Sequence, residues 1–352
     1  MNAIKAKRKT IPMPVRYLIN TALIVVFVLG GSALTGSGAV SGYVTKVLML
    51  IGINIILAVS LNVATGYLGQ LPLGHAGFMA VGAYAGGIFL KAVNAAKLAG
   101  AARVGAVAAA LLLSGIVAAV FGILIGIPAL RLKGDYLAII TLGFGEIIRV
   151  ALTNIDDLLG FKLTYGASGL KRIPKVTTFF NVAVMVAVTC VVIHMIMKSR
   201  HGRAILSIRE NEIAAESCGI RTTYYKVMAF TLSAFFAGIA GCLYAGYLGS
   251  LQPTTFGFMK SIEILVMVVL GGMGSMLGSI LSAAVLTALP ELLRAFSDYR
   301  MVVYSLVLVL MMIFKPTGLL GQYDFSLSRI LEKLLNGELG RQKKTEGGAG
   351  RE

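Results

Sequence analysis

The sequence predicts an all-α transmembrane protein, a polytopic helical bundle of about 8–10 spans with two Gly/Pro-broken or re-entrant segments. Three observations support this fold class. Of the 352 residues, 57% are hydrophobic and only 13% are charged, whereas a soluble domain carries about 25% charged residues. Uncharged runs such as 104–130 are long enough to cross a hydrocarbon core of about 30 Å. Glycine is abundant, with 42 residues, and small residues let membrane helices approach closely.

The N-terminal residues 1–16 are basic and precede the first expected span, from about Tyr17 to Leu34. This order of basic, apolar and small residues also resembles a signal peptide. The many spans that follow favour an uncleaved helix. Because Lys and Arg concentrate in the cytoplasmic connections of membrane proteins, we expect a basic cytoplasmic N-terminus.

Residues 17–197 are expected to form the first six transmembrane helices, at about 17–34, 47–64, 77–90, 104–130, 136–152 and 176–197. Six crossings from a cytoplasmic start return the chain to the cytoplasm at residues 198–226. That connection is basic, and its six Lys and Arg residues are Lys198, Arg200, Arg203, Arg209, Arg221 and Lys226. The crossings and the charges therefore both predict a cytoplasmic loop at 198–226.

The C-terminal transmembrane region is expected at 227–321, with a seventh span at 227–248 and a last span at about 301–314. Between them, the apolar stretch 261–294 is interrupted by "GGMGS", a break near 271–275. A re-entrant pair of half-helices or two short full crossings would both return the chain to the cytoplasm. Either arrangement makes residues 322–352 a polar cytoplasmic tail.

The first break, near 66–76, reads "GYLGQLPLGHA". Glycine and proline do not continue an ordinary helix, and non-helical backbone at membrane depth survives only where protein buries it or a cavity wets it. Because Gly/Pro-interrupted segments in both halves of a transporter point to its pathway, we expect the translocation pathway at the two breaks. The candidate pathway residues are Asn62, Gly69, Gln70, Gly74, His75, Gly272 and Gly274. Gln70 could line the route or cap freed backbone groups, and for His75 a hydrogen-bonding role is favoured over proton transfer.

Other polar residues in the apolar runs have simpler interpretations. Glu146 and Arg149 are three positions apart on one expected helix, which predicts an intrahelical ion pair. Asn54 and Asn62 on the second span are expected to hydrogen-bond to other helices. The GxxxG spacing of Gly82 and Gly86 predicts close helix packing.

The charged stretch "RAILSIRENEIAAESCGIR" (203–221) interrupts this apolar chain. We expect a helix from Ala204 to Cys218 that ends at Gly219, since glycine commonly follows a helix C-terminus. Glu212 and Glu216 would repel each other one turn apart, and Arg209 would partly offset this repulsion. Ile208, Ala215 and Cys218 would form a small apolar face. Such a helix suits docking into a groove on a partner, although a solvated helix or one lying on lipid headgroups fits the same pattern.

The stretch "GRAILSIRENEIAAESCGI" resembles the cytoplasmic coupling loop of ABC importer permeases, whose signature reads Glu-Ala-Ala, three residues, Gly. Ala214, Ala215 and Gly219 match this signature. The signature's Glu falls on Ile213, and an acid stands one place earlier, at Glu212. This departure weakens the match to permeases in general.

Four further stretches resemble the LivM-type permease family of branched-chain amino acid importers. They are "GYLGQLPLGHAGFMAVGAYAGG", "KGDYLAIITLGFGEIIRV", "VLGGMGSMLGSILSAAVL" and "FKPTGLLG". The resemblance covers residues 47–321, most of the chain. It implies a multi-pass permease subunit in a bacterial inner (plasma) membrane, with both termini cytoplasmic.

The resemblance also implies partners and a division of labour. Two cytoplasmic ATPase subunits would drive transport, a second LivH-like permease would complete the pathway, and an extracytoplasmic binding protein would deliver leucine, isoleucine or valine. The coupling residues implied are Arg209, Glu212, Ala214, Ala215, Glu216 and Gly219. The sequence contains no GxxxxGK[ST] phosphate loop, so ATP hydrolysis is assigned to the partners.

Several other classes fit the sequence less well. The net charge of +17 is concentrated in connections and at the ends, which is typical of membrane topology and not of nucleic-acid binding. No paired carboxylates, HExxH motif or Cys/His cluster indicates an enzyme, a metal or a cofactor. The remaining alternatives are an ABC permease for urea, amides or another small polar solute, and an ion-coupled secondary transporter.

Overall fold

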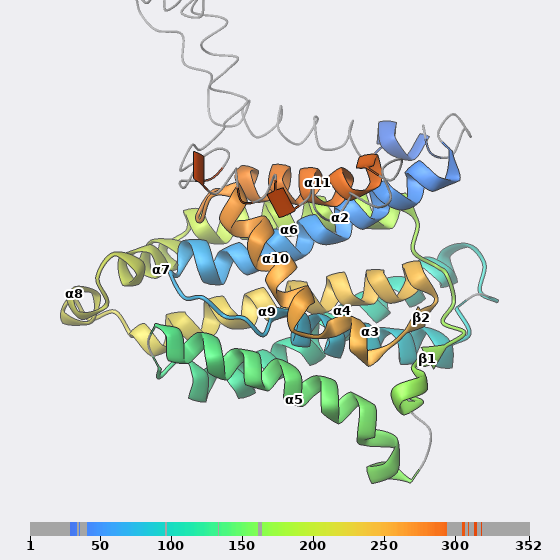
Figure 1. Ribbon diagram of the computed structural model, residues 1–352, viewed down its shortest axis with the longest axis horizontal. Coiled ribbons are helices and arrows are strands. Elements are labelled where there is room, and N and C mark those ends of the chain that lie inside the picture. The colour runs from blue at the N-terminus through green and yellow to red at the C-terminus, as the bar shows by residue number, and fades with distance from the viewer. Residues whose placement is uncertain are drawn as a thin grey trace, which may run out of the picture.

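The computed structural model describes residues 29–33, 35, 41–95, 97–132, 134–160 and 164–293, with six isolated positions between 305 and 318. The predictions for residues 1–16, for most of the first span, for most of the span at 301–314 and for the tail at 322–352 lie outside the described residues. The described chain is a helical bundle with one short two-stranded ribbon (Figure 1).

Helices account for nearly all regular structure in the described residues. They are α2 (Gly42–Asn62), α3 (His75–Ala92), α4 (Gly100–Ala129), α5 (Asp135–Leu159), α6 (Phe179–Lys198), α7 (Arg200–Glu210), α8 (Glu212–Ser217), α9 (Thr222–Leu248), α10 (Phe258–Gly271) and α11 (Met276–Leu292). Six helical segments in this part of the chain are long and apolar enough to cross a membrane: Gly42–Tyr67, Gly100–Ala129, Asp135–Asp157, Phe179–Lys198, Thr222–Leu248 and Pro253–Gly271. The predicted all-α membrane class is therefore confirmed.

Most predicted spans correspond closely to observed helices. The runs expected at 104–130 and 176–197 are α4 and α6, and the fifth span continues beyond 152 in the longer α5. The seventh span begins at Thr222 in α9, earlier than the predicted 227, so that Lys226 lies inside a helix. The expected loop at 198–226 is thus largely helical.

The core of the bundle forms around α9, which packs against α2, α3 and α4. Glycine makes these contacts close: a Cβ atom on Gly82 of α3 would overlap the backbone of Gly238 on α9. Phe78 and Phe230 meet edge to face in the same interface, with ring centroids 5.4 Å apart. The GxxxG spacing at Gly82 therefore marks helix packing, as expected.

The stretch 261–294 forms two helices joined by a tight turn, as the break near 271–275 predicted. Gly272 and Gly274 in this turn have φ values of 99° and 91°, which favour glycine. The helices α10 and α11 then pack on each other, and a Cβ on Gly271 would overlap the backbone of Gly278. The Ser275 side chain caps α11 by accepting a hydrogen bond from the Gly278 N–H at 3.1 Å.

Helix α5 lies along one edge of the bundle, away from α2, α6 and α11 (Figure 1). Its outward face is apolar and exposed, and includes Tyr136, Ile139 and Ile147. An apolar face of this kind is covered by lipid or by another membrane subunit.

A two-stranded antiparallel ribbon closes the end of the bundle opposite α7 and α8 (Figure 1). Strand β1 (Leu170–Lys171) follows α5 and pairs with β2 (Ser250–Leu251), which follows α9. Leu170 and Leu251 face each other and are both buried. The Thr177 hydroxyl adds a hydrogen bond to the Leu243 carbonyl at 2.9 Å, so the α5–α6 connection is fixed to the end of α9.

Candidate functional site

The charged segment consists of two helices, α7 and α8, and the expected continuous helix from Ala204 to Cys218 is wrong. The break lies at Asn211, whose backbone is extended with φ −158° and ψ 109°. Its side-chain oxygen accepts a hydrogen bond from the Ala214 N–H at 3.1 Å. Asn is among the preferred N-cap residues, so "NEIA" contained a helix-start signal that the interpretation as one helix missed.

The end of α8 follows the prediction. Gly219 has a φ of 80°, and its N–H donates to the Glu216 carbonyl at 2.9 Å. The next N–H, of Ile220, donates to the Ala215 carbonyl at 3.1 Å. These two bonds form a Schellman motif, in which glycine is preferred because the backbone is left-handed.

The two faces of the segment differ partly from the expectation. Ile208 and Ala215, which were expected on a small apolar face that docks on a partner, are buried within this chain, whereas Cys218 is exposed. The break at Asn211 rotates α8 relative to α7, so residues beyond it do not continue the same stripe. The outer face of α8 consists of exposed residues, including Ala214 and Glu216, with Ile213 exposed at 73%.

A hollow lies at the connection between α8 and α9. It has a volume of about 370 Å³ and is lined by Gly219, Ile220, Arg221, Tyr224 and Tyr225. Tyr224 and Tyr225 meet edge to face with ring centroids 5.2 Å apart. The exposed face of α8 and this hollow are two candidate surfaces for a partner.

Glu212 and Arg209 bind different partners. They were expected to interact with each other along one helix. Lys226 of α9 donates to Glu212 at 2.6 Å, and the Lys226 side chain is only 4% exposed. The break at Asn211 places Arg209 and Glu212 on separate helices, which removes their three-residue helical spacing. Sequence reasoning missed Lys226 because no local pattern distinguishes a buried lysine.

Arg209, in the last turn of α7, reaches the first break. Its Nη1 atom donates to the Gly66 carbonyl oxygen at 2.5 Å. Its aliphatic stem lies against Gly69, where an added Cβ would come within 3.1 Å of Arg209 Cγ. Gly69 has a φ of 76°, so this position favours glycine both for its backbone and for the space that the stem fills.

The first break begins in a π-helical turn, Val63–Tyr67, at the end of α2. The Gln70 N–H then donates to the Ala64 carbonyl at 3.0 Å, and residues 71–74 continue without helix to the start of α3. Gly74 packs against α5, because a Cβ there would overlap the Thr141 carbonyl. The Leu73 N–H donates to the Thr141 hydroxyl at 3.0 Å, so α5 supplies the partner that the broken backbone lacks.

The two breaks meet each other through Asn62. Its side-chain oxygen accepts a hydrogen bond from the Gly274 N–H at 2.9 Å, and its side-chain nitrogen donates to the Ser275 carbonyl at 3.2 Å. Gly66 lies so close to Gly274 that a Cβ on Gly66 would overlap the Gly274 backbone. We refer to Asn62, Gly66, Gly69, Arg209, Gly274 and Ser275 as the junction. It lies where α7 meets the ends of α2 and α10 (Figure 1).

The other expected pathway residues occupy more than one environment. His75 is buried at the start of α3, and its Nε2 lies 3.1 Å from the Ser60 hydroxyl. The expected hydrogen bond of His75 is thus present, within an interface that also joins the Ser233 hydroxyl to the Ser60 carbonyl at 2.7 Å. Gly272 is buried, whereas Gln70 is half-exposed and Gly69 is exposed.

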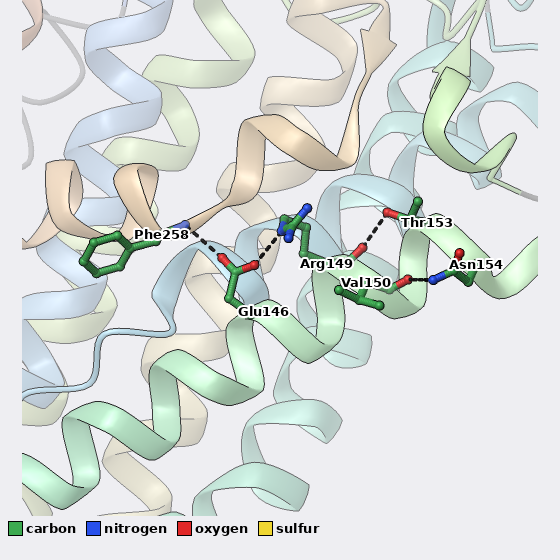
Figure 2. Close-up of polar contacts among 6 residues, drawn as sticks. All are labelled: Glu146, Arg149, Val150, Thr153, Asn154 and Phe258. Carbon is green, nitrogen blue, oxygen red and sulfur yellow. Dashed lines mark hydrogen bonds and ion pairs between the residues drawn. The ribbon is translucent and has the colours of Figure 1, made fainter.

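Glu146 and Arg149 form the predicted intrahelical pair on α5, and they also contact α10. Arg149 Nε donates to Glu146 Oε2 at 2.6 Å (Figure 2). The other carboxylate oxygen, Oε1, accepts the Phe258 N–H at the start of α10 at 3.1 Å (Figure 2). A carboxylate at a helix N-terminus satisfies a free N–H and interacts favourably with the helix dipole. Lys260 and Glu263, three positions apart on α10, form a further ion pair at 3.0 Å.

Comparison with known proteins gives consistent matches over most of the chain. A family model described as "Branched-chain amino acid transport system / permease component" matches residues 43–315. The high-affinity branched-chain amino acid transport system permease protein LivM of Salmonella typhimurium is 38% identical over 302 residues, which cover 76% of this chain and 68% of that protein. LivM of Escherichia coli K12 is 37% identical over 319 residues, covering 81% and 70%.

A second type of permease in such systems is also similar. The permease protein LivH of Salmonella typhimurium is 29% identical over 185 residues, which cover 52% of this chain and 58% of that protein. Both types therefore share sequence features with this chain over a substantial part of its length.

Proposed function

Since the chain belongs to the family of branched-chain amino acid transport system permease components, we propose that it is a permease subunit of an ATP-driven importer of leucine, isoleucine and valine. The observation that supports this proposal is the match to LivM-type permeases over three quarters of the chain or more. The chain itself lacks a phosphate-binding loop, so partner ATPases hydrolyse the nucleotide. It is a transport subunit and not an enzyme.

The proposed complex contains this chain, a second permease similar to LivH, two ATPase subunits and an external amino-acid-binding protein. The similarity of this chain to LivH supports a pair of related permeases, because related subunits readily pack about a pseudo-two-fold axis. The exposed apolar face of α5 is available for such a subunit or for lipid.

In the proposed orientation, α7, α8 and both termini face the cytoplasm in a bacterial plasma membrane. The outer face of α8, with Ile213, Ala214 and Glu216, docks on an ATPase, and the neighbouring hollow receives part of the same partner. Closure of the ATPases on ATP moves α7 and α8, and with them α6 and α9, to which they are joined. This movement alternately opens the pathway on the two sides of the membrane.

Uptake measurements test this function. Cells that lack the chromosomal copy of this gene should regain uptake of radiolabelled leucine when the gene is restored, and vanadate should abolish the regained uptake. Excess isoleucine or valine should compete, whereas urea and fructose should not. Competition by urea or an amide alone would assign a different substrate class. Uptake that persists with vanadate but collapses with a protonophore would indicate an ion-coupled transporter instead.

The orientation has a separate test. Cys218 is exposed at the end of α8, so a membrane-impermeant maleimide should label it in inside-out vesicles and not in intact cells. A Cys218→Ser variant provides the control for labelling at Cys190. Labelling of Cys218 in intact cells would place α8 outside and would contradict docking on a cytoplasmic ATPase.

A further inference from the structure

We infer that Arg209 is a positioning residue that couples the movement of α7 to the two helix breaks. It does not belong to the surface that meets a partner. This inference rests on the proposed function, because it assigns Arg209 an internal role in the transport cycle. The residue belongs to the segment that resembles a coupling loop, but its guanidinium lies against Gly66 and Gly274.

The first argument is chemical. Gly66 lies in the last turn of the helix that begins with α2, where carbonyl groups lack intrahelical donors. Arg209 Nη1 supplies a donor to the Gly66 carbonyl at 2.5 Å. A positive charge at a helix C-terminus also interacts favourably with the helix dipole. Arg209 therefore supplies the hydrogen-bond donor that the Gly66 carbonyl lacks, and its charge stabilises the C-terminal end of this helix.

The second argument is spatial, because Arg209 contacts both breaks at once. A Cβ on Gly69 would lie 3.1 Å from Arg209 Cγ, and a Cβ on Gly274 would lie 2.9 Å from Arg209 Nη1. Larger residues at either glycine would displace the arginine. The two glycines come from segments about two hundred positions apart in sequence, and the arginine side chain fits between them.

The third argument concerns what α7 can move. Asn62 joins the end of α2 to the α10–α11 turn through two hydrogen bonds of 2.9 and 3.2 Å. Gly66 and Gly274 are in backbone contact, so the two breaks form one unit that Arg209 holds to α7. A displacement of α7 by about 1 Å or more would take the Arg209–Gly66 contact beyond hydrogen-bonding distance.

The fourth argument is that the partner-facing role falls to other residues. Glu212 anchors α8 to Lys226 of α9 at 2.6 Å, while Ala214 and Glu216 face outward. The segment thus has two inward contacts to different elements: Arg209 to Gly66 in the first break and Glu212 to Lys226 of α9. Helices α7 and α8 are therefore each attached to the transmembrane helices by a separate contact.

The test compares Arg209→Ala and Arg209→Lys with Arg203→Ala, a control on the exposed side of the same helix. The whole transporter is purified through this chain from its native membrane and reconstituted with its binding protein. Leucine uptake and ATP hydrolysis are then measured in the same vesicles. Arg209→Ala should lower the leucine transported per ATP by about tenfold, a factor that corresponds to about 1.4 kcal/mol and to the loss of one charge-assisted hydrogen bond.

The variants separate positioning from docking. Arg209→Ala should retain the ATPase subunits, Arg209→Lys should recover part of the uptake per ATP, and Arg203→Ala should match the wild type. Unchanged uptake per ATP in Arg209→Ala would overturn the inference, and so would loss of the ATPase subunits from that variant. If the wild-type complex itself shows no ATP-dependent leucine uptake, the proposed function fails before the variants are compared.

A cross-link provides a second readout that does not depend on the activity of Arg209 variants. A Cβ on Gly69 would lie 3.7 Å from the Cβ of Arg209, close to the disulfide mean of about 3.8 Å. The pair Gly69→Cys and Arg209→Cys, with Cys218→Ser, should form a disulfide readily in the nucleotide-free complex and much more slowly after vanadate trapping. Equal cross-linking in both states would show that α7 does not separate from the first break, and would overturn the inference.

Discussion

The side-chain oxygen of Asn62 accepts a hydrogen bond from the Gly274 N–H at 2.9 Å, although 212 positions separate the two residues. The same carboxamide donates to the Ser275 carbonyl at 3.2 Å. Asn62 is completely buried, so one side-chain amide supplies both a donor and an acceptor to the turn between α10 and α11.

Replacing Asn62 with leucine should destabilise the protein by about 2 kcal/mol, because it leaves the Gly274 N–H without its acceptor and removes one of the donors to the Ser275 carbonyl. The midpoint of thermal unfolding in detergent measures this change. Asn154→Leu is the matched control, since the Asn154 amide is exposed and donates only to the Val150 carbonyl of its own helix at 3.1 Å (Figure 2). An equal loss of stability in both variants would contradict the importance of the Asn62 contact.

Gly82→Ala should lower the unfolding midpoint, because the new methyl group would overlap the Gly238 backbone and separate α3 from α9. Overpacking of this kind costs about 1–3 kcal/mol. Gly143→Ala on α5 is the control, since a Cβ there meets nothing within 4 Å. The control should be neutral or stabilising, because alanine favours helix over glycine by about 1 kcal/mol. A similar midpoint for the two variants would refute the close contact.

Glu212→Gln should destabilise the α8–α9 connection by about 2 kcal/mol, because it weakens the partner of a buried ammonium group. Lys226 is 3% exposed, and its ammonium group donates to the Glu212 carboxylate at 2.6 Å. Glu216→Gln should change stability little, since Glu216 is exposed on the same helix. Thermal unfolding of the purified chain distinguishes the two variants. If Glu216→Gln proved the more damaging change, the assignment of Glu212 as the anchor would be wrong.

Gly219→Val should loosen the end of α8, because a β-branched residue at a φ of 80° is strained by about 1–3 kcal/mol. Gly219→Asn should be milder, since Asn tolerates the left-handed region. Limited trypsin digestion gives the readout, because Arg221 lies exposed just after the cap. Cleavage at Arg221 should be fastest in the valine variant. Identical cleavage rates in all three proteins would argue against a role for the Schellman motif.

Ile213→Lys should lower recovery of ATPase subunits with the purified chain and leave its thermal unfolding unchanged. Ile213 is 73% exposed, so the substitution removes apolar surface available to a partner without disturbing the core. Met195→Lys controls for a general effect of added charge, since Met195 on α6 is 64% exposed. Full recovery of the ATPase subunits with Ile213→Lys would move the docking surface away from α8.

Much of this architecture could be predicted from local sequence, because each span carries its own apolar signal. The ends of α4 and α6 lie close to the predicted ones, and the glycine-rich stretches mark both breaks. Hydropathy is a property of consecutive residues. A membrane helix can therefore be predicted from its own residues, without knowing which other helices pack against it.

The site could be predicted only in part, because its contacts join distant segments. Nothing near Arg209 in the sequence indicates Gly66, which is 143 positions away. The burial of Lys226 depends on Glu212 of another helix, and this tertiary contact extends α9 into what composition predicted as loop. The break at Asn211 was accessible to local reasoning, but the continuous charge pattern of the segment obscured its capping signal.

Helix α9 extends from the charged segment to the two-stranded ribbon, a length of about 40 Å for its 27 residues. One end is held to α8 by Lys226, and the other is held to the α5–α6 connection through Leu251 and its strand pairing. Because α9 is held at both ends, a tilt of the helix that begins at one end also moves the other end. In the proposed complex, if binding at the ribbon changes the affinity of the ATPases for nucleotide, thermodynamic linkage requires that nucleotide changes the affinity at the ribbon by the same factor.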